Sequence, residues 1–243
     1  MRIYYWIILA LALTGLPSTS NAMHITEGIL PPQWAALWYA LAIPFVGWGL
    51  RDLRLRAAKE PFFKPMAGLV GAAVFVISCM PIPVPTAGTC SHPCGTGIAA
   101  ILIGPFLTVV ISSVALLLQA LFLAHGGLTT LGANIFSMGV VGSFSGYAVF
   151  HLTRRAGLPV VAAAFLAGLI SDWATYATTS VELASALHGG GSFLNMALAI
   201  GASFMPTQLP LGLFEGVFTA GIYRFISQRR PSLLENLQTE GAL

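Results

Sequence analysis

The sequence predicts an all-α fold: a polytopic membrane helical bundle of about six or seven transmembrane helices, after a cleaved signal peptide. Hydrophobic residues make up 56% of the 243-residue chain and charged residues only 8%, whereas a soluble globular chain has roughly 25% charged residues. Lys and Arg outnumber Asp and Glu by 11 to 8, and they stand in short clusters between apolar runs. This arrangement is typical of membrane topology signals and excludes a nucleic-acid surface.

The first 22 residues have the features of a secretory signal peptide. Arg2 is followed by an apolar stretch too short to span lipid, and the segment ends in Ser20-Asn21-Ala22, which signal peptidase accepts. We therefore expect residues 1–22 to be removed and residues 23–243 to form one transmembrane domain. Its new amino terminus, Met23, would lie outside the cytoplasm. An uncleaved first transmembrane helix is the alternative.

Six apolar runs follow along the mature chain. They cover residues 34–50, 66–82, 98–124, 131–152, 158–179 and 193–226. A helix needs about 20 residues to cross a bilayer, so each run is a candidate span. The last run contains Pro206 and Pro210, and it is expected to form either one kinked helix or two short ones.

Basic clusters set the expected orientation of these spans. Segment 51–64 and the pair Arg229-Arg230 should be cytoplasmic, because Lys and Arg are enriched in cytoplasmic loops. An outer amino terminus and an inner carboxyl terminus require an odd number of crossings. About seven crossings, the favoured count, place Arg154 and Arg155 outside. A count of about five places this pair inside, but then residues 97–124 cannot form a single straight span.

The expected mature terminus, Met23-His24, can chelate a metal. The Met23 amine, the His24 backbone amide once deprotonated and the His24 imidazole offer three nitrogens that close a five-membered and a six-membered ring. This nearly planar arrangement suits late divalent metals such as Ni²⁺, Cu²⁺ and Co²⁺. A fourth ligand is still needed.

His92 is the best candidate for the fourth ligand. With segment 51–64 inside, both His92 and the amino terminus lie on the outer face, where an imidazole with a pKa of about 6.5 is largely neutral. A hydrogen-bonded structural role is the alternative for any single histidine. The neighbouring Cys90 and Ser91 are candidates for groups that surround the ligands. Cys90 and Cys94 can instead form a disulfide or pack as thiols.

Polar side chains inside apolar runs are costly and therefore informative. They are Gln119, Asn134, Asp172, Gln208 and Glu215. Asn134 is expected either to orient an imidazole near the ion or to form a bond between helices. Asp172 and Glu215 are expected to have partners on other helices, or to dock another subunit, in preference to binding metal.

An enzyme is a remote alternative. Ser143 and Ser145, with His151 or His188, are the only material for an intramembrane hydrolase. Neither serine stands in a G-x-S-x-G elbow, and the sequence has no H-E-x-x-H helix. It also has no G-x-x-x-x-G-K-[ST] phosphate loop, so ATP hydrolysis would belong to another polypeptide.

An ordered set of motifs resembles the CbiM family of cobalt transport proteins. The motifs are Met23-His24, Gly-Thr-Cys-Ser-His-Pro at 88–93, Gly104-Pro105 and His-Gly-Gly-Leu-Thr-Thr-Leu-Gly-Ala-Asn at 125–134. The resemblance covers nearly all of the mature chain. It departs from the family in its leader peptide, because members often begin directly at Met-His.

The resemblance implies a substrate-capture component of an energy-coupling-factor transporter in the cell inner membrane. Its substrate would be Co²⁺ for cobalamin synthesis, with Ni²⁺ as the alternative, and no organic cofactor is implied. The implied ligands are Met23, His24 and His92. The implied partners are a small membrane subunit, a transmembrane coupling subunit and ATPase subunits, all within membrane lipid.

Overall fold

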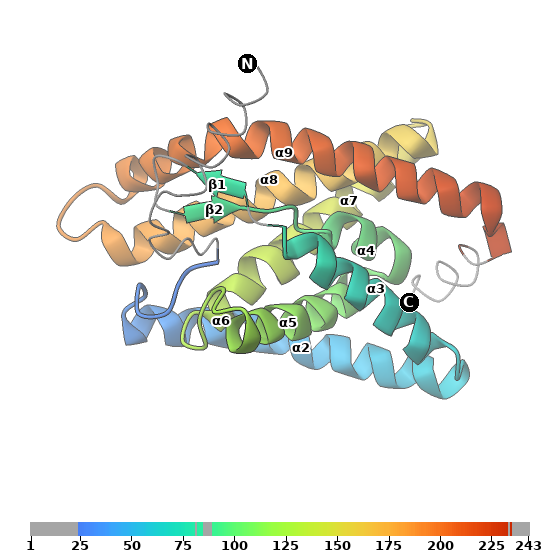
Figure 1. Ribbon diagram of the computed structural model, residues 1–243, viewed down its shortest axis with the longest axis horizontal. Helices are drawn as coiled ribbons and strands as arrows, with labels where there is room; N and C mark the ends of the chain where they lie inside the picture. The colour runs from blue at the N-terminus through green and yellow to red at the C-terminus, as the bar shows by residue number, and fades with distance from the viewer. Residues whose placement is uncertain (1–23, 81, 85–88, 233, 235–243) are drawn as a thin grey trace, which may run out of the picture.

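The computed structural model describes residues 24–80, 82–84, 89–232 and 234 (Figure 1). The expected signal peptide, residues 1–22, and the expected terminal residue Met23 lie outside the described residues, as does the side chain of Cys90.

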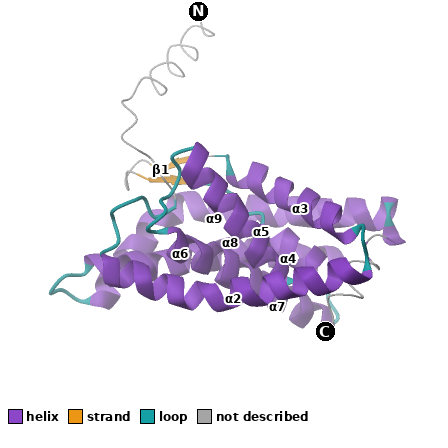
Figure 2. Ribbon diagram, turned by 90° about the horizontal axis from the view of Figure 1, so that it is seen from below, coloured by secondary structure: helices purple, strands orange, loops and turns teal. Residues whose placement is uncertain are grey.

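Helices dominate the described chain and lie side by side along its long axis (Figure 1, Figure 2). They are α2 (Pro32–Lys59), α3 (Phe63–Ser78), α4 (Thr96–Ile103), α5 (Pro105–Phe122), α6 (Leu131–Asn134), the π-helical η1 (Ile135–Gly142), α7 (Ser143–Arg155), α8 (Val160–Leu187) and α9 (Phe193–Arg229). The predicted helical bundle is confirmed. One short antiparallel hairpin, β1 (Ile82–Val84) with β2 (Thr89–Ser91), was not expected.

Four of the described helical units are long and apolar enough to cross a membrane: Pro105–Phe122, Leu131–Arg155, Val160–Leu187 and Phe193–Arg229. The apolar α3 has only 16 residues, so the predicted count of about six or seven crossings is not confirmed. Helix α9 runs unbroken through Pro206 and Pro210, which settles the alternatives for the last run in favour of one helix. Large apolar side chains such as Phe122 and Leu69 face outward, as a lipid-embedded surface requires.

The apolar run at 98–124 is not a single span. It forms α4 and α5, which are separated at Gly104, whose φ of 89° lies in the left-handed region. Such a φ favours glycine, and Pro105 begins the next helix, where a missing backbone N–H costs nothing. The loop before α4 and the end of α5 both reach His24. The two helices therefore form a hairpin whose tip, Gly104, points toward the other end of the bundle.

Seven of the described helices contribute to one apolar cluster around this tip. Its buried side chains come from α3, α4, α5, α7, α8 and α9, and Leu53 of α2 packs against them; they include Phe63, Ile103, Leu107, Phe150, Ala163 and Tyr223.

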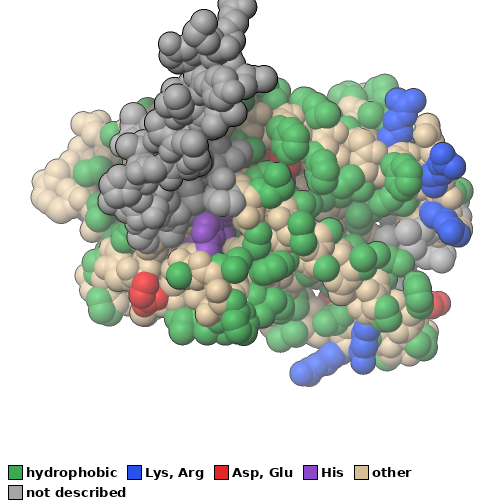
Figure 3. Space-filling model, in the orientation of Figure 1, with side chains coloured by type: hydrophobic (Ala, Val, Ile, Leu, Met, Phe, Trp, Pro, Cys, Tyr) green, Lys and Arg blue, Asp and Glu red, His purple; other side chains and the backbone are tan. Residues whose placement is uncertain are grey.

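Basic side chains gather at this end, here called the basic end (Figure 3). It comprises Arg51, Arg54, Lys59, Lys64, Arg154, Arg155, Arg229 and Arg230. The favoured count of crossings placed Arg154 and Arg155 on the side opposite segment 51–64. That placement is wrong, because the hairpin at Gly104 adds a reversal that a single span lacks.

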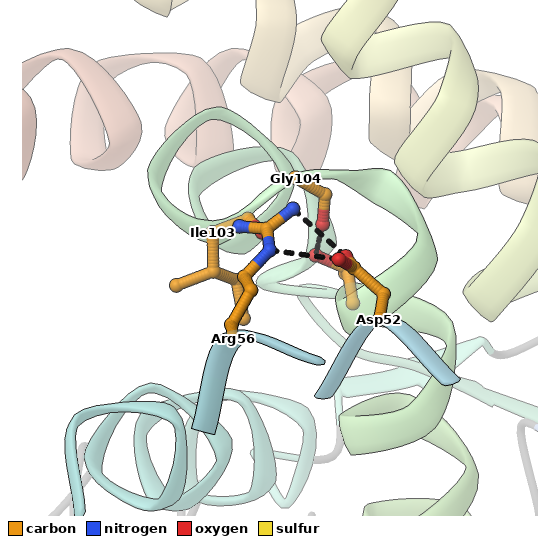
Figure 4. A network of polar contacts seen from close by, with 5 residues as sticks. Asp52, Arg56, Ile103 and Gly104 are labelled. Carbon is orange, nitrogen blue, oxygen red and sulfur yellow. Dashed lines mark hydrogen bonds and ion pairs between the residues drawn. The ribbon is translucent and has the colours of Figure 1, made fainter. Parts of the chain in front are cut away.

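A buried arginine holds the tip of the hairpin (Figure 4). The Arg56 guanidinium pairs with Asp52 at 2.8 Å, and its Nη1 donates to the Ile103 carbonyl at 3.0 Å. The last carbonyls of a helix have no partner within the helix, so Arg56 satisfies one of them at the end of α4. The Thr108 hydroxyl likewise donates to the Gly104 carbonyl at 2.8 Å.

Candidate metal site

Three histidines converge at the end of the bundle opposite the basic end. His24 precedes α2, His92 precedes α4 and His125 lies between α5 and α6. One ring nitrogen of each lies within 4.8 Å of the other two. The ring centroids of His24 and His92 are 4.7 Å apart, and those of His24 and His125 are 4.9 Å apart. The structure thus brings together the predicted pair, His24 and His92, and adds His125, which the sequence analysis did not name as a ligand. We call these three residues the histidine cluster.

The hydrogen bonds of His92 fix its tautomer. Its Nδ1 lies 2.8 Å from the Pro93 carbonyl oxygen, which only accepts, so Nδ1 carries the hydrogen. Nε2 then carries the lone pair, and it lies within hydrogen-bond distance, 3.2 Å, of Nε2 of His24. His92 therefore presents an unprotonated nitrogen to the cluster, as a metal ligand must.

Gln119 fixes the tautomer of His24. The Gln119 side-chain amide donates to the Ser78 hydroxyl at 2.7 Å, and its Oε1 lies 2.8 Å from His24 Nε2. Because Oε1 only accepts, His24 carries its hydrogen on Nε2 and leaves the lone pair on Nδ1. Nδ1 is the ring atom that closes a six-membered chelate ring with the backbone nitrogen of His24. Oriented imidazoles of this kind are typical of metal sites.

Hydrogen bonds hold the segment after His24 against α6 and the loop between α5 and α6. Asn134 accepts from the Ile25 N–H at 2.9 Å, and its amide donates to the Ile25 carbonyl at 3.3 Å. Thr130 also donates to that carbonyl. Gly127 is required here, since an added Cβ would lie 2.7 Å from the Glu27 backbone. Asn134 was predicted to orient an imidazole or to link helices; it holds the backbone beside His24 instead.

A cavity of about 10 Å³ lies against His24 and His92, which is room for roughly one water molecule or one ion. Its other lining residues include Asn134, Ser137 and Tyr176. A far larger hollow of about 510 Å³ runs between α3 and α5, but its lining is apolar except for Lys64. The small cavity beside His24 and His92, which His125 does not line, therefore has the size and nitrogen donors for a metal ion, and the large hollow lacks such donors.

Burial keeps the cluster neutral. Burial lowers the pKa of His24 well below its usual 6.5, and the neighbouring His92 and His125 lower it further. Burial also lowers the pKa of His92, to about 4, and that of His125. All three imidazoles therefore keep a lone pair at neutral pH. That they bind a metal stays a prediction.

A second buried group of polar side chains includes Cys94, which lies two positions after His92 in the sequence. It consists of Cys94, Asp172 and Glu215, here called the carboxylate cluster, whose ligand atoms also lie within 4.8 Å of one another. The two Glu215 oxygens accept from the backbone N–H groups of Cys94 at 2.7 Å and Gly95 at 2.8 Å. Asp172 and Glu215 were predicted to have partners on other helices or to dock another subunit; Glu215 instead braces the loop that carries His92.

Cys94 is a thiol in this cluster. It is a free cysteine in the structure, and its Sγ lies 3.8 Å from Asp172 Oδ1. Burial raises the pKa of the thiol, and the carboxylates of Glu215 and Asp172 raise it further. Because thiolates and not thiols bind metals, Cys94 is a poor ligand in this environment, and the disulfide considered for it is absent from the described part of the chain.

Ser91 holds the same loop from another side. Its hydroxyl accepts from the Gln208 side-chain amide at 2.5 Å and lies 3.0 Å from the Thr207 hydroxyl. Tyr176 bonds to the backbone of His92 at 3.4 Å and 3.2 Å. Ser91 was predicted to surround the ligands. It links the loop that carries His92 to α9 through its bonds to Gln208 and Thr207.

The residues considered for an intramembrane hydrolase do not assemble. The Ser143 and Ser145 hydroxyls donate to backbone carbonyls, including those of Gly139 and Gly142. The ring centroids of His151 and Tyr147 are 4.2 Å apart, and His188 Nδ1 donates a hydrogen bond to the Ala184 carbonyl at 2.8 Å. Neither serine is bonded to either histidine.

Sequence reasoning missed the roles of two residues in the site. Gln119 was noted only as a polar residue in an apolar run, and His125 only as part of a stretch rich in glycine and threonine. The cost of burying Gln119 was the available signal for its role. For His125, the sequence offered no signal beyond its place in a motif.

Comparisons with known proteins identify the family. Residues 24–233 match the family model described as CbiM, cobalt uptake substrate-specific transmembrane region. The cobalt transport protein CbiM of Sorangium cellulosum is 61% identical over 216 residues, which cover 89% of this chain and 96% of that protein. The protein of that name in Geobacter sulfurreducens is 58% identical over 222 residues, which cover 91% of this chain and 64% of the relative.

Two solved structures have the same fold. A crystal structure of a truncated transition metal transporter is 27% identical, with a TM-score of 0.75, and covers 85% of this chain and 99% of its own. A second transition metal transporter is 26% identical, with a TM-score of 0.75, and covers 85% of this chain and 93% of its own. Given the family match, the high identity to its relatives and the shared fold, this chain belongs to the CbiM family and is a membrane component of cobalt transport.

Proposed function

We propose that this chain is the substrate-binding membrane component of an ATP-driven energy-coupling-factor transporter that takes up Co²⁺ for cobalamin synthesis. The observation that carries the proposal is the meeting of His24 and His92, whose Nε2 atoms lie 3.2 Å apart. The hydrogen bonds of both rings leave one lone pair on each for an ion. The family match to cobalt uptake supports the choice of metal.

The proposed ligands are the Met23 amine, the His24 backbone nitrogen, His24 Nδ1 and His92 Nε2. This set requires that residues 1–22 are removed as a signal peptide, so that the amine of Met23 is free. Its support is the buried position of His24, which is 6% exposed, together with the bonds from Asn134 to the next residue. Because His24 and Ile25 are already held in place, less conformational entropy is lost when the metal binds.

The proposed location is the cell inner membrane, with the mature amino terminus outside the cytoplasm. The basic end would face the cytoplasm, in accord with the positive-inside rule. The shared position of Arg154-Arg155 and Arg229-Arg230 supports this orientation, because every basic loop then lies on one side. The histidine cluster would open to the outside and receive Co²⁺ there.

The proposed partners are a small membrane subunit, a transmembrane coupling subunit and ATPase subunits. Because the sequence has no phosphate loop, we assign ATP hydrolysis to the ATPase subunits and no enzymatic step to this chain. Ni²⁺ is the second candidate substrate, since a planar set of nitrogens suits Ni²⁺ at least as well as Co²⁺. The similar solved structures are described only as transition metal transporters.

The test begins with mass spectrometry of the purified chain, which should show Met23 as the first residue. Calorimetry should then detect one Co²⁺ site. Adding Gly-Ser before Met23 blocks the chelate, and His92→Ala removes the fourth ligand. Each change should weaken Co²⁺ binding by at least about 100-fold, because even groups that only orient ligands contribute 10–100-fold.

A Gly-Ser extension at the carboxyl terminus is the control and should leave binding unchanged. Normal Co²⁺ binding by a chain that retains its leader would overturn the chelate. A correctly processed chain that binds neither Co²⁺ nor Ni²⁺ would overturn the proposed function as a whole.

A further inference from the structure

His125 Nε2 is a buried nitrogen without a hydrogen-bond partner among the described residues. The other two histidines each have a ring nitrogen bonded to a fixed acceptor, Gln119 for His24 and Pro93 for His92. A buried polar atom without a partner costs free energy, and native proteins keep few of them. An ion bound beside His125 would give this atom a partner.

A backbone hydrogen bond and a glycine turn fix the position of His125. Its backbone N–H donates to the Gln119 carbonyl at 3.2 Å, so the residue that orients His24 also holds the backbone of His125. Gly126 follows with a φ of 83°, and an added Cβ there would lie 3.0 Å from the His24 Cβ. The turn therefore brings the His125 ring to within 4.9 Å of the His24 ring and 5.8 Å of the His92 ring, measured between centroids.

We infer that His125 Nε2 is a fifth nitrogen donor to the bound metal and that it shifts the preference of the site from Ni²⁺ toward Co²⁺. The inference rests on the proposed function and extends it from metal capture to metal choice. The terminal amine, the His24 backbone nitrogen, His24 Nδ1 and His92 Nε2 fill a plane around the ion, so a further donor must approach from outside that plane.

The electronic structures of the two metals explain the expected preference. A planar set of four strong nitrogen donors stabilises Ni²⁺ with paired electrons, and such an ion gains little from a fifth ligand. Co²⁺ has one electron fewer and accepts a fifth donor readily. Geometry, more than raw affinity, decides selectivity among these metals, so a single imidazole outside the plane can favour the metal that otherwise binds less tightly.

The first test compares His125→Ala with His188→Ala. His188 is the matched control, because its Nδ1 bonds to the Ala184 carbonyl and it lies outside the cluster. In His125→Ala, Co²⁺ affinity should fall by about tenfold or more, the lower bound for groups that support a metal site. Ni²⁺ affinity should change much less, and His188→Ala should match the unmodified chain for both metals.

The second test needs no substitution. In low-spin Co²⁺ the unpaired electron occupies an orbital that is directed toward the fifth ligand. Electron paramagnetic resonance of the Co²⁺-loaded chain should therefore show splitting from one nitrogen. Labelling all histidines with the heavy nitrogen isotope should change that splitting pattern, whereas labelling the methionines should not.

The outcomes separate this inference from the proposed function. If His92→Ala loses binding while His125→Ala keeps the same ratio of Co²⁺ to Ni²⁺ affinity, the inference fails and the proposed function stands. Resonance splitting that histidine labelling leaves unchanged would also overturn it. If His92→Ala binds Co²⁺ as well as the unmodified chain does, the proposed function itself fails.

Discussion

The histidine cluster and the carboxylate cluster each take one residue from the same loop, yet their polar atoms are used differently. His92 and Cys94 are two positions apart in one loop. In the histidine cluster, His24 Nδ1 and His92 Nε2 are left with lone pairs, and His125 Nε2 has no partner among the described residues. In the carboxylate cluster, both Glu215 oxygens are committed to backbone N–H groups.

The difference lies in how the Glu215 carboxylate is used, because it supports the backbone of a loop. Both clusters satisfy the same 4.8 Å distance criterion. In the carboxylate cluster Asp172 Oδ2 also has no partner among the described residues, but both oxygens of Glu215 are taken by backbone N–H groups. The Glu215 oxygens hold the loop on which His92 stands, so this cluster supports the loop, whereas the histidine cluster is the proposed metal site.

Replacing Glu215 should give the largest effect on stability. Glu215→Ala leaves the N–H groups of Cys94 and Gly95 buried without acceptors, at about 1–3 kcal/mol for each group. Thermal unfolding in detergent should show a clear loss of stability, and Glu215→Gln, which keeps one acceptor oxygen, should lose less. The number of bound Co²⁺ ions should stay the same. Unchanged stability with fewer bound ions would mean that the carboxylate cluster is an ion site.

Replacing Gln119 should have an intermediate effect, which we expect on the affinity for Co²⁺. Gln119→Leu frees His24 to carry its hydrogen on Nδ1, which blocks the proposed chelate. Co²⁺ affinity, measured by calorimetry, should fall about 10–100-fold, as for other groups that orient a metal-binding imidazole. Gln119→Glu keeps an acceptor at the same position and should restore much of the affinity. Equal affinities of Gln119→Leu and the unmodified chain would show that the tautomer of His24 does not matter.

The smallest expected effect is the number of protons that the histidines themselves release when Co²⁺ binds, which should be close to zero. Because burial holds the pKa of His92 at about 4 and that of His24 below 6.5, both rings are already neutral at pH 7. A terminal amine has a pKa of about 8, so the amine and the backbone amide should together release about two protons when Co²⁺ binds.

Calorimetry in buffers of different ionisation enthalpy measures this release. Affinity should rise by about 100-fold for each pH unit below the pKa of the amine, if two protons are displaced. A release close to zero would indicate that the three imidazoles bind the ion without the amine and the amide. In that case, acid should weaken binding only as the pH falls toward the lowered pKa values of the histidines.

Much of the fold could be read from the sequence because apolar character is a local property. Three of the predicted runs each lie almost entirely within one long helical unit: 131–152, 158–179 and 193–226. In lipid, the backbone N–H and C=O groups must form their hydrogen bonds within the chain, and a helix does this. The run at 98–124 misled the prediction. It is apolar on both sides of Gly104-Pro105, and only the left-handed turn at Gly104 and the Arg56 contact with Ile103 show that the chain reverses there.

The sequence by itself determined the membrane class, the Met23-His24 chelate as a hypothesis and His92 as its companion, because each follows from residue types and short spacings. Only the tertiary structure decided that His125 joins them, that Gln119 selects the tautomer of His24 and that Glu215 braces the loop. These contacts join residues such as His24 and Gln119, which are 95 positions apart. Helix packing brings such residues together, and no local pattern encodes which distant side chains will meet.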